Sequence, residues 1–199
     1  MRKVTSRLVP RIVTLSALAL GTALALVAAA TTVSATQPLN GLFRVAKGSY
    51  FRMLYPGGGK YFKNPYSKDA NKTYTLIIAG SDGGLRTGVL QPAPTPAFDH
   101  HGNSLAGRII QPTDFTGINF GLATKGIAPE ISVSGTRLSG QVKGFAAEWN
   151  KLTFNQGGQV TGSYSAKTHT YVLTWKSKIS GGPFNGFTGS WYLTGKYVS

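Results

Sequence analysis

The sequence predicts an all-β protein, an antiparallel β-sandwich or flattened β-barrel of about eight to ten strands. Apolar and polar residues alternate with a period of two through most of the chain after residue 35. The alternating segments are separated by turns rich in glycine, which occurs 26 times, and proline, which occurs 10 times. Both features are typical of strands joined by tight turns and loops.

The first part of this domain is expected to contain a hairpin followed by a loop. Thr73–Ala79 is predicted to be a strand, Ser81–Gly84 its turn, and Leu85–Leu90 the returning strand. Gln91–Asn103 contains three prolines and a polar turn, so it is expected to run over the surface rather than through a sheet.

The middle of the chain is expected to contain shorter strands. Ala106–Ile110 and Thr116–Leu122 are strand candidates, and Glu130–Ser134 and Arg137–Val142 are predicted to form a hairpin. Phe145–Lys151 is the one segment with a helical pattern, and it allows little more than about two turns.

The C-terminal hairpin has the clearest pattern. Side chains alternate between two faces along Thr170–Ile179 and along Phe187–Val198. Pairing the two apolar faces places Trp175 opposite Trp191 in the core. A slip of one residue would turn lysines into the core, so the register is expected to be strongly fixed.

The opposite face of this hairpin is the predicted ligand-binding surface. Lys176, Lys178 and Lys196 fall on it among threonines and serines, with no acidic residue. Such a surface suits weak, multivalent contact with an anionic polymer of the cell envelope. The alternative is that these lysines keep an exposed sheet soluble and discourage edge pairing.

A glycine- and aromatic-rich stretch, Gly181–Trp191, provides the fourth candidate residue. Phe184 is expected either to be presented at the mouth of the barrel or sandwich as a ligand-binding residue, or to belong to a tight loop before a core strand. This stretch, Ser81–Gly88 and Gln91–Phe98 together resemble a family of small secreted actinobacterial β-proteins of uncharacterised function. The resemblance implies a compartment and no activity.

The first 35 residues have the three-part pattern of a secretory signal peptide. Ile12–Ala30 carries no charge, and Val33–Ala35 has small residues where a signal peptidase cleaves. Four basic residues precede the apolar run: Arg2, Lys3, Arg7 and Arg11. We expect residues 1–35 to be removed and residues 36–199 to form a single secreted or envelope-associated domain with no stable membrane span. The alternative is an uncleaved membrane anchor.

Composition excludes several classes of protein. Cysteine is absent, which excludes disulfides, thiolate metal sites and a cysteine nucleophile. The predicted signal peptide takes four of the 21 basic residues, which leaves 17 against six acidic residues. This excess favours acidic partners. The basic residues form no run, so the sequence indicates no specific nucleic-acid motif, and it indicates no oligomeric state either.

Neither catalytic nor metal-binding residues are predicted. Asp99, His100 and His101 are consecutive, and adjacent side chains diverge, so a solvated turn is favoured over a metal site. The chain lacks a Gly-x-Ser-x-Gly elbow. Glu130 and Glu148 could pair for glycoside hydrolysis, although salt bridges are the simpler role for acids in so basic a chain.

Three functions remain open. The leading one is a secreted, non-catalytic binding or envelope-associated module that needs no cofactor. The second is a carrier of a small apolar ligand, for which haem with a tyrosine or histidine axial ligand is one candidate. The third is a hydrolase of cell-wall glycan. A large apolar cavity would favour the carrier, and two carboxylates converging in a cleft would favour the hydrolase.

Overall fold

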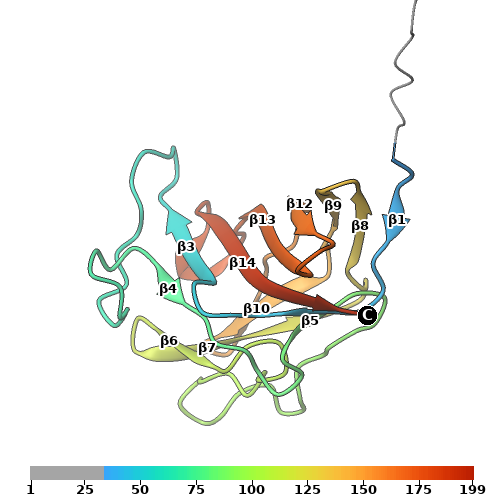
Figure 1. Ribbon diagram of the computed structural model, residues 1–199. Coiled ribbons are helices and arrows are strands. Elements are labelled where there is room, and N and C mark those ends of the chain that lie inside the picture. Colours follow the sequence, from blue (N-terminus) through green and yellow to red (C-terminus); the bar gives the residue numbers. More distant parts are fainter. Residues whose placement is uncertain (1–33) are drawn as a thin grey trace, which may run out of the picture. The chain divides into compact units, whose positions relative to one another are not determined.

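The computed structural model describes residues 34–199, which form one compact unit of fourteen strands in two antiparallel sheets (Figure 1). This confirms the predicted all-β class. The predicted signal peptide lies outside the described residues, except for Ser34 and Ala35. Among the described residues no helix is long and apolar enough to span a bilayer.

The larger sheet has ten strands, and its longest strand, β14, has partners on both sides. The path through the sheet is β1-β8-β9-β12-β13-β14-β2-β5, and β3 also pairs with β14 and with β4. The strands are β1 (Gln37–Pro38), β2 (Leu42–Arg44), β3 (Tyr50–Leu54), β4 (Thr75–Leu76), β5 (Gly84–Arg86), β8 (Glu130–Ser134), β9 (Arg137–Gln141), β12 (Gln159–Ser165), β13 (Thr170–Lys178) and β14 (Thr188–Val198).

Two different strands share one edge of β14. Thr188–Tyr192 pairs with β3, and Tyr197 and Val198 pair with β2. Between these two segments, a Cβ at Gly195 would lie 1.8 Å from the carbonyl oxygen of Arg44, so the close approach of the backbones requires glycine there.

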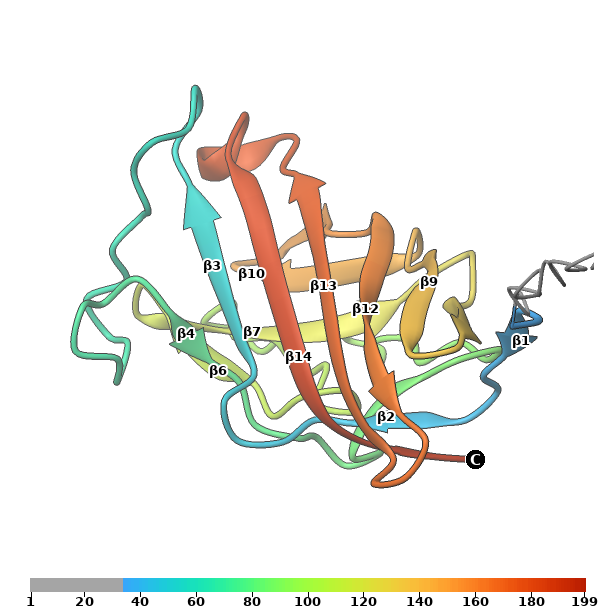
Figure 2. The same cartoon turned by 45° about the horizontal axis from the view of Figure 1, so that its top comes forward.

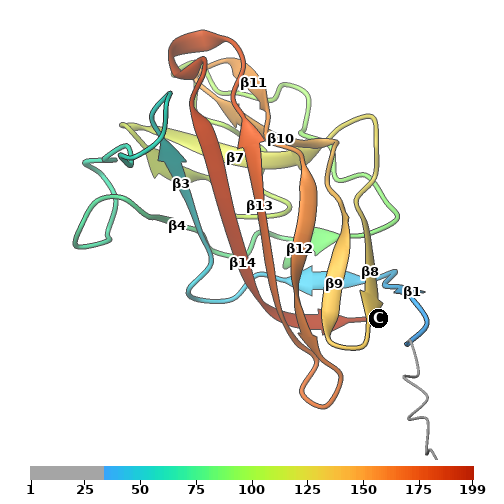
Figure 3. The same ribbon diagram turned by 90° about the horizontal axis from the view of Figure 1, so that it is seen from above.

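The smaller sheet has four strands in the order β11-β10-β7-β6. They are β6 (Thr113–Phe115), β7 (Ile118–Thr124), β10 (Phe145–Trp149) and β11 (Leu152–Asn155). Figures 2 and 3 show β12, β13 and β14 side by side in front of β7 and β10, which run across them. The core lies between the two sheets.

The predicted tryptophan pair is confirmed at the centre of this core. Trp175 is the registered partner of Trp191, and their rings stack with centroids 5.6 Å apart and planes 9° apart. Gln156, itself buried, joins both indoles. Its carbonyl oxygen accepts a hydrogen bond from Trp175 Nε1 at 2.9 Å, and its Oε1 accepts bonds from Trp191 Nε1 at 3.3 Å and Ser177 Oγ at 2.7 Å.

Several predicted elements are also confirmed. The hairpin of Glu130–Ser134 with the following strand is β8 and β9, and the C-terminal hairpin is β13 and β14. Along β13, buried side chains alternate with exposed or half-buried ones as expected. Gln91–Asn103 forms no strand, and one isolated bridge joins Phe98 to Ser104.

Three expectations are wrong. Phe145–Lys151 contains strand β10 rather than a helix, because four of the five β10 residues are buried between β7 and β11. Thr73–Ala79 and Leu85–Leu90 do not pair with each other, since β4 pairs with β3 and β5 with β2. Ala106–Ile110 forms only an isolated bridge, from Ile110 to Ala79.

Candidate functional site

The face of β3, β12, β13 and β14 that points away from the four-stranded sheet carries the predicted lysines. We call it the outer face. Its side chains alternate in sequence with the buried ones, which places Arg52 and Lys176 on it with Phe51 and Trp175 on the inside. The outer face comprises Tyr50, Arg52, Thr161, Thr174, Lys176, Lys178, Ser190, Tyr192, Thr194 and Lys196.

An arginine surrounded by tyrosines occupies one end of the outer face. The Arg52 guanidinium carbon lies 4.1 Å from the ring centroid of Tyr61 and 5.2 Å from that of Tyr74, and its Nη1 donates to Tyr74 Oη at 3.1 Å. Tyr50 stacks on Tyr192 with centroids 5.0 Å apart. Burial raises the pKa of the Tyr50 hydroxyl, against the opposing effect of the Arg52 charge. The rings therefore hold a cation, and within residues 34–199 no carboxylate lies within ion-pair distance of it.

Arg52 and Lys176 flank a shallow pocket. Ser190 on β14 is the registered partner of both, Arg52 on β3 and Lys176 on β13. Strands β3 and β13 lie on either side of β14, so the Cα atoms of Arg52 and Lys176 lie about 10 Å apart. The pocket between them has a volume of about 360 Å³, and hydroxyls of Thr161, Thr174 and Ser190 line it. The lining thus includes two basic residues and several hydroxyl-bearing side chains, and no acidic residue.

The three predicted lysines share the outer face but not one site. Lys176 and Lys178 are close, and the Lys178 ammonium donates to the carbonyl of Gly186 at 3.0 Å. Lys196 pairs with Thr170 at the opposite end of β13. It lies six residues along β14 from the partner of Lys176, a separation of about 20 Å.

Phe184 lies in a short 3₁₀ helix (Gly182–Phe184) and packs inward. Its ring is 5.2 Å from that of Trp149 and 5.5 Å from that of Phe115, between centroids. The side chain is half-buried and helps to close one end of the core. This placement fits a closing loop better than a ring presented to a ligand.

The charges of the described residues are strongly unbalanced. Within residues 34–199 the one ion pair joins Arg108 to Asp82 at 2.9 Å. Other acids are held by uncharged donors: Asp114 accepts from the Gly117 N–H, and Glu148 from the Thr153 hydroxyl. Most of the lysines and arginines are therefore free to attract anions.

The other predicted candidates are not brought together. Glu130 lies on β8 in the larger sheet, whereas Glu148 is buried on β10 in the smaller one. Asp99 accepts two hydrogen bonds from Asn103, and this lowers the pKa of its carboxyl group. In the part of the chain that the structure describes, no group of three His, Asp or Glu side chains could hold a metal ion.

The core has little space for a ligand. A cavity of about 30 Å³ lies among apolar side chains that include Phe51, Phe120, Trp149 and Trp191. Ligand pockets have volumes of about 300–1,000 Å³. This cavity is too small for haem.

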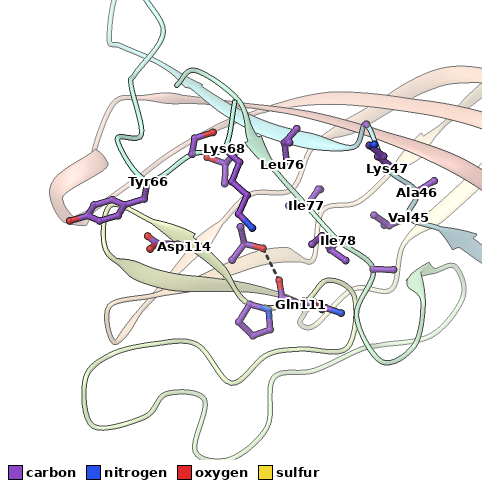
Figure 4. Close-up of a pocket in the computed structure, with 16 residues that line it drawn as sticks. Val45, Ala46, Lys47, Tyr66, Lys68, Leu76, Ile77, Ile78, Gln111 and Asp114 are labelled. Atoms are coloured by element: carbon purple, nitrogen blue, oxygen red, sulfur yellow. Dashed lines mark hydrogen bonds between the residues drawn. The ribbon is translucent and has the colours of Figure 1, made fainter. Parts of the chain in front are cut away.

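A larger groove lies outside the core, beside β4 and β6. Its volume is about 590 Å³. Figure 4 shows Leu76, Ile77 and Ile78 along one side, Gln111 opposite, and the Lys68 side chain reaching in between. The groove is the second candidate site, and no motif in the sequence indicates it.

The Arg52 cluster was also missed, although its signal is present in the sequence. Along Tyr50–Leu54 the polar Arg52 lies between the apolar Phe51 and Met53, which are buried, and this alternation is a strand pattern. The pairing of this strand with β14 cannot be read from the pattern.

Comparison with known proteins finds no match: no family model, no curated protein and no solved structure is similar to this chain. The resemblance to secreted actinobacterial proteins stays a prediction.

Proposed function

We propose that this protein is a secreted, non-catalytic module that binds an anionic polymer of the cell envelope through its outer face. The observation that carries the proposal is the pocket between Arg52 and Lys176, whose lining includes several hydroxyl-bearing side chains and no acidic residue. The excess of free cations over the rest of the domain adds long-range attraction. The signal-peptide pattern of residues 1–35 supports export.

The geometry favours a repeating ligand over a compact one. Lys176 and Lys178 lie close together, and Lys196 lies at the other end of β13. One small anion cannot reach both ends of a sheet that separates them by about 20 Å. A flexible chain with a phosphate or carboxylate on each unit can contact all of them weakly, and each lysine then acts as a point charge.

The test is retention of residues 36–199 on immobilised poly(glycerol phosphate) under rising salt. The parent protein should bind at low salt and elute at moderate salt, because exposed charges are screened beyond about 8 Å at physiological ionic strength. The variant with Lys176→Gln, Lys178→Gln and Lys196→Gln should elute earlier, with an unchanged circular dichroism spectrum.

A matched variant controls for net charge. Lys125→Gln, Lys143→Gln and Lys151→Gln remove the same charge from exposed residues in loops next to β7, β10 and β11. This variant should elute close to the parent. Equal weakening of both variants would show that net charge alone drives retention, and no weakening of the outer-face variant would show that this face is only solvated.

A further inference from the structure

The groove beside β4 and β6 is a preformed hollow with fixed walls. At one end the buried Asn64 joins the two sides, since its Nδ2 donates to Thr75 Oγ1 at 3.2 Å and to the Asp114 carbonyl at 3.1 Å. At the other end the Gln111 N–H donates to the carbonyl of Ile78 at 2.9 Å, and the Ile77 N–H to that of Ser49 at 3.1 Å. A ligand therefore meets walls that are already ordered, which lowers the entropic cost of binding.

The exposed surface of the groove is mainly apolar. It includes Val45, Leu76, Ile77, Ile78, Ala79 and Pro112. Leu76 is 44% exposed and Ile78 is 59% exposed, which is high for side chains of this type. Covering them would bury apolar surface, so the groove favours an apolar ligand. Both side chains line the groove, so a ligand in the groove can cover them.

The charges of the groove are two lysines and one acid. Figure 4 shows the Lys68 side chain extending between the two walls, with Lys47 at the other end near Val45. Asp114 also lines the groove, and its Oδ1 already accepts the Gly117 N–H at 2.8 Å. No carboxylate of the described residues lies within ion-pair distance of Lys68. A ligand with an anionic group is therefore favoured over a neutral or cationic one.

We propose that this groove binds the anion of a fatty acid, with its acyl chain along Leu76 and Ile78 and its carboxylate at the Lys68 ammonium. A volume of about 590 Å³ lies within the range of small-molecule pockets, about 300–1,000 Å³. The site is separate from the outer face, so it adds a ligand to the proposed function without depending on it.

The test uses residues 36–199, a dansyl-labelled undecanoate as the fluorescent probe, and two competitors, laurate below its critical micelle concentration and dodecanol below its solubility limit. Laurate should displace the probe about tenfold better than dodecanol, because a charge-assisted hydrogen bond is lost with the alcohol. Lys68→Met should remove this preference, because it weakens the binding of laurate and leaves the binding of dodecanol unchanged. Ile78→Asp should weaken the binding of both competitors, and that of laurate more strongly.

Two controls separate this site from the rest of the domain. Lys143→Met, a change of the same kind in the loop after β9, should leave the binding of both competitors unchanged. The triple outer-face variant should also leave it unchanged. The proposal is overturned if laurate and dodecanol compete equally, if Lys68→Met keeps the preference, or if neither competitor displaces the probe. Size-exclusion chromatography provides a further outcome. A dimer that persists in laurate but dissociates in the Ile78→Asp variant would assign the groove to a second copy of the chain instead.

Discussion

Replacing Gln156 with leucine tests whether one polar side chain holds the tryptophan pair in the core. Leucine is similar in size and cannot accept the hydrogen bonds from Ser177 Oγ at 2.7 Å and Trp191 Nε1 at 3.3 Å. The bond from Trp175 goes to the backbone carbonyl and remains. Each buried donor left without an acceptor costs about 1–3 kcal/mol. The bond from Trp191, at 3.3 Å, is the weaker of the two. Gln156→Leu should therefore lower the free energy of unfolding by about 2–4 kcal/mol.

Urea denaturation of residues 36–199, followed by tryptophan fluorescence, measures this change. Gln159→Leu is the control, because Gln159 is exposed and its replacement should change the unfolding free energy by less than about 0.5 kcal/mol. Ser177→Ala completes a double-mutant cycle. With the serine donor removed as well, the double variant should be about 1–2 kcal/mol more stable than the sum of the single changes predicts. An unchanged urea midpoint for Gln156→Leu, or strictly additive changes, would refute the reasoning.

Two other predictions concern the same core and the ion pair of Asp82 with Arg108. Gly189→Ala would place a Cβ 2.4 Å from Gln156 Oε1 and 2.5 Å from Ser177 Oγ, so it should lower the unfolding free energy by about 1–3 kcal/mol; an unchanged thermal midpoint would contradict this. Burial acts to raise the pKa of Asp82, but hydrogen bonds from Gln91 and Arg108 outweigh it and lower the pKa. The stabilisation by Asp82 is therefore present above about pH 4, the range where an unfolded aspartate is ionised, and is lost as the pH falls through the lowered folded pKa. Acid unfolding curves of the parent should thus be steeper below about pH 4 than those of Asp82→Asn, and identical curves would exclude this contribution.

Alternation along a strand predicted which side chains are buried better than it predicted which strands pair. In the C-terminal hairpin the partners are neighbours in sequence, so the apolar faces alone set Trp175 opposite Trp191. The segments around Thr75 and Leu85 have the same kind of pattern, but their partners lie on β3 and β2. Local sequence carries no information about such distant partners.

The sequence distance between neighbouring segments also explains which residues of the two candidate sites could be predicted. The lysines of the outer face were found because one hairpin carries them. Arg52 joins them only through the pairing of β3 with β14. The groove is assembled from four separate segments, residues 45–48, 66–68, 75–79 and 111–114, so no spacing within one segment could reveal it.

Residues 188–198 also determine when the domain can fold. As the chain is synthesised, β2 and β3 are made early, and β14, their partner in the large sheet, is the last of the strands to be made. Until then the backbone groups that β2 and β3 present to β14 stay unpaired, and Trp191 is missing from the core. Such long-range pairing slows folding. The large sheet can therefore be completed only after the C-terminal strand has been made.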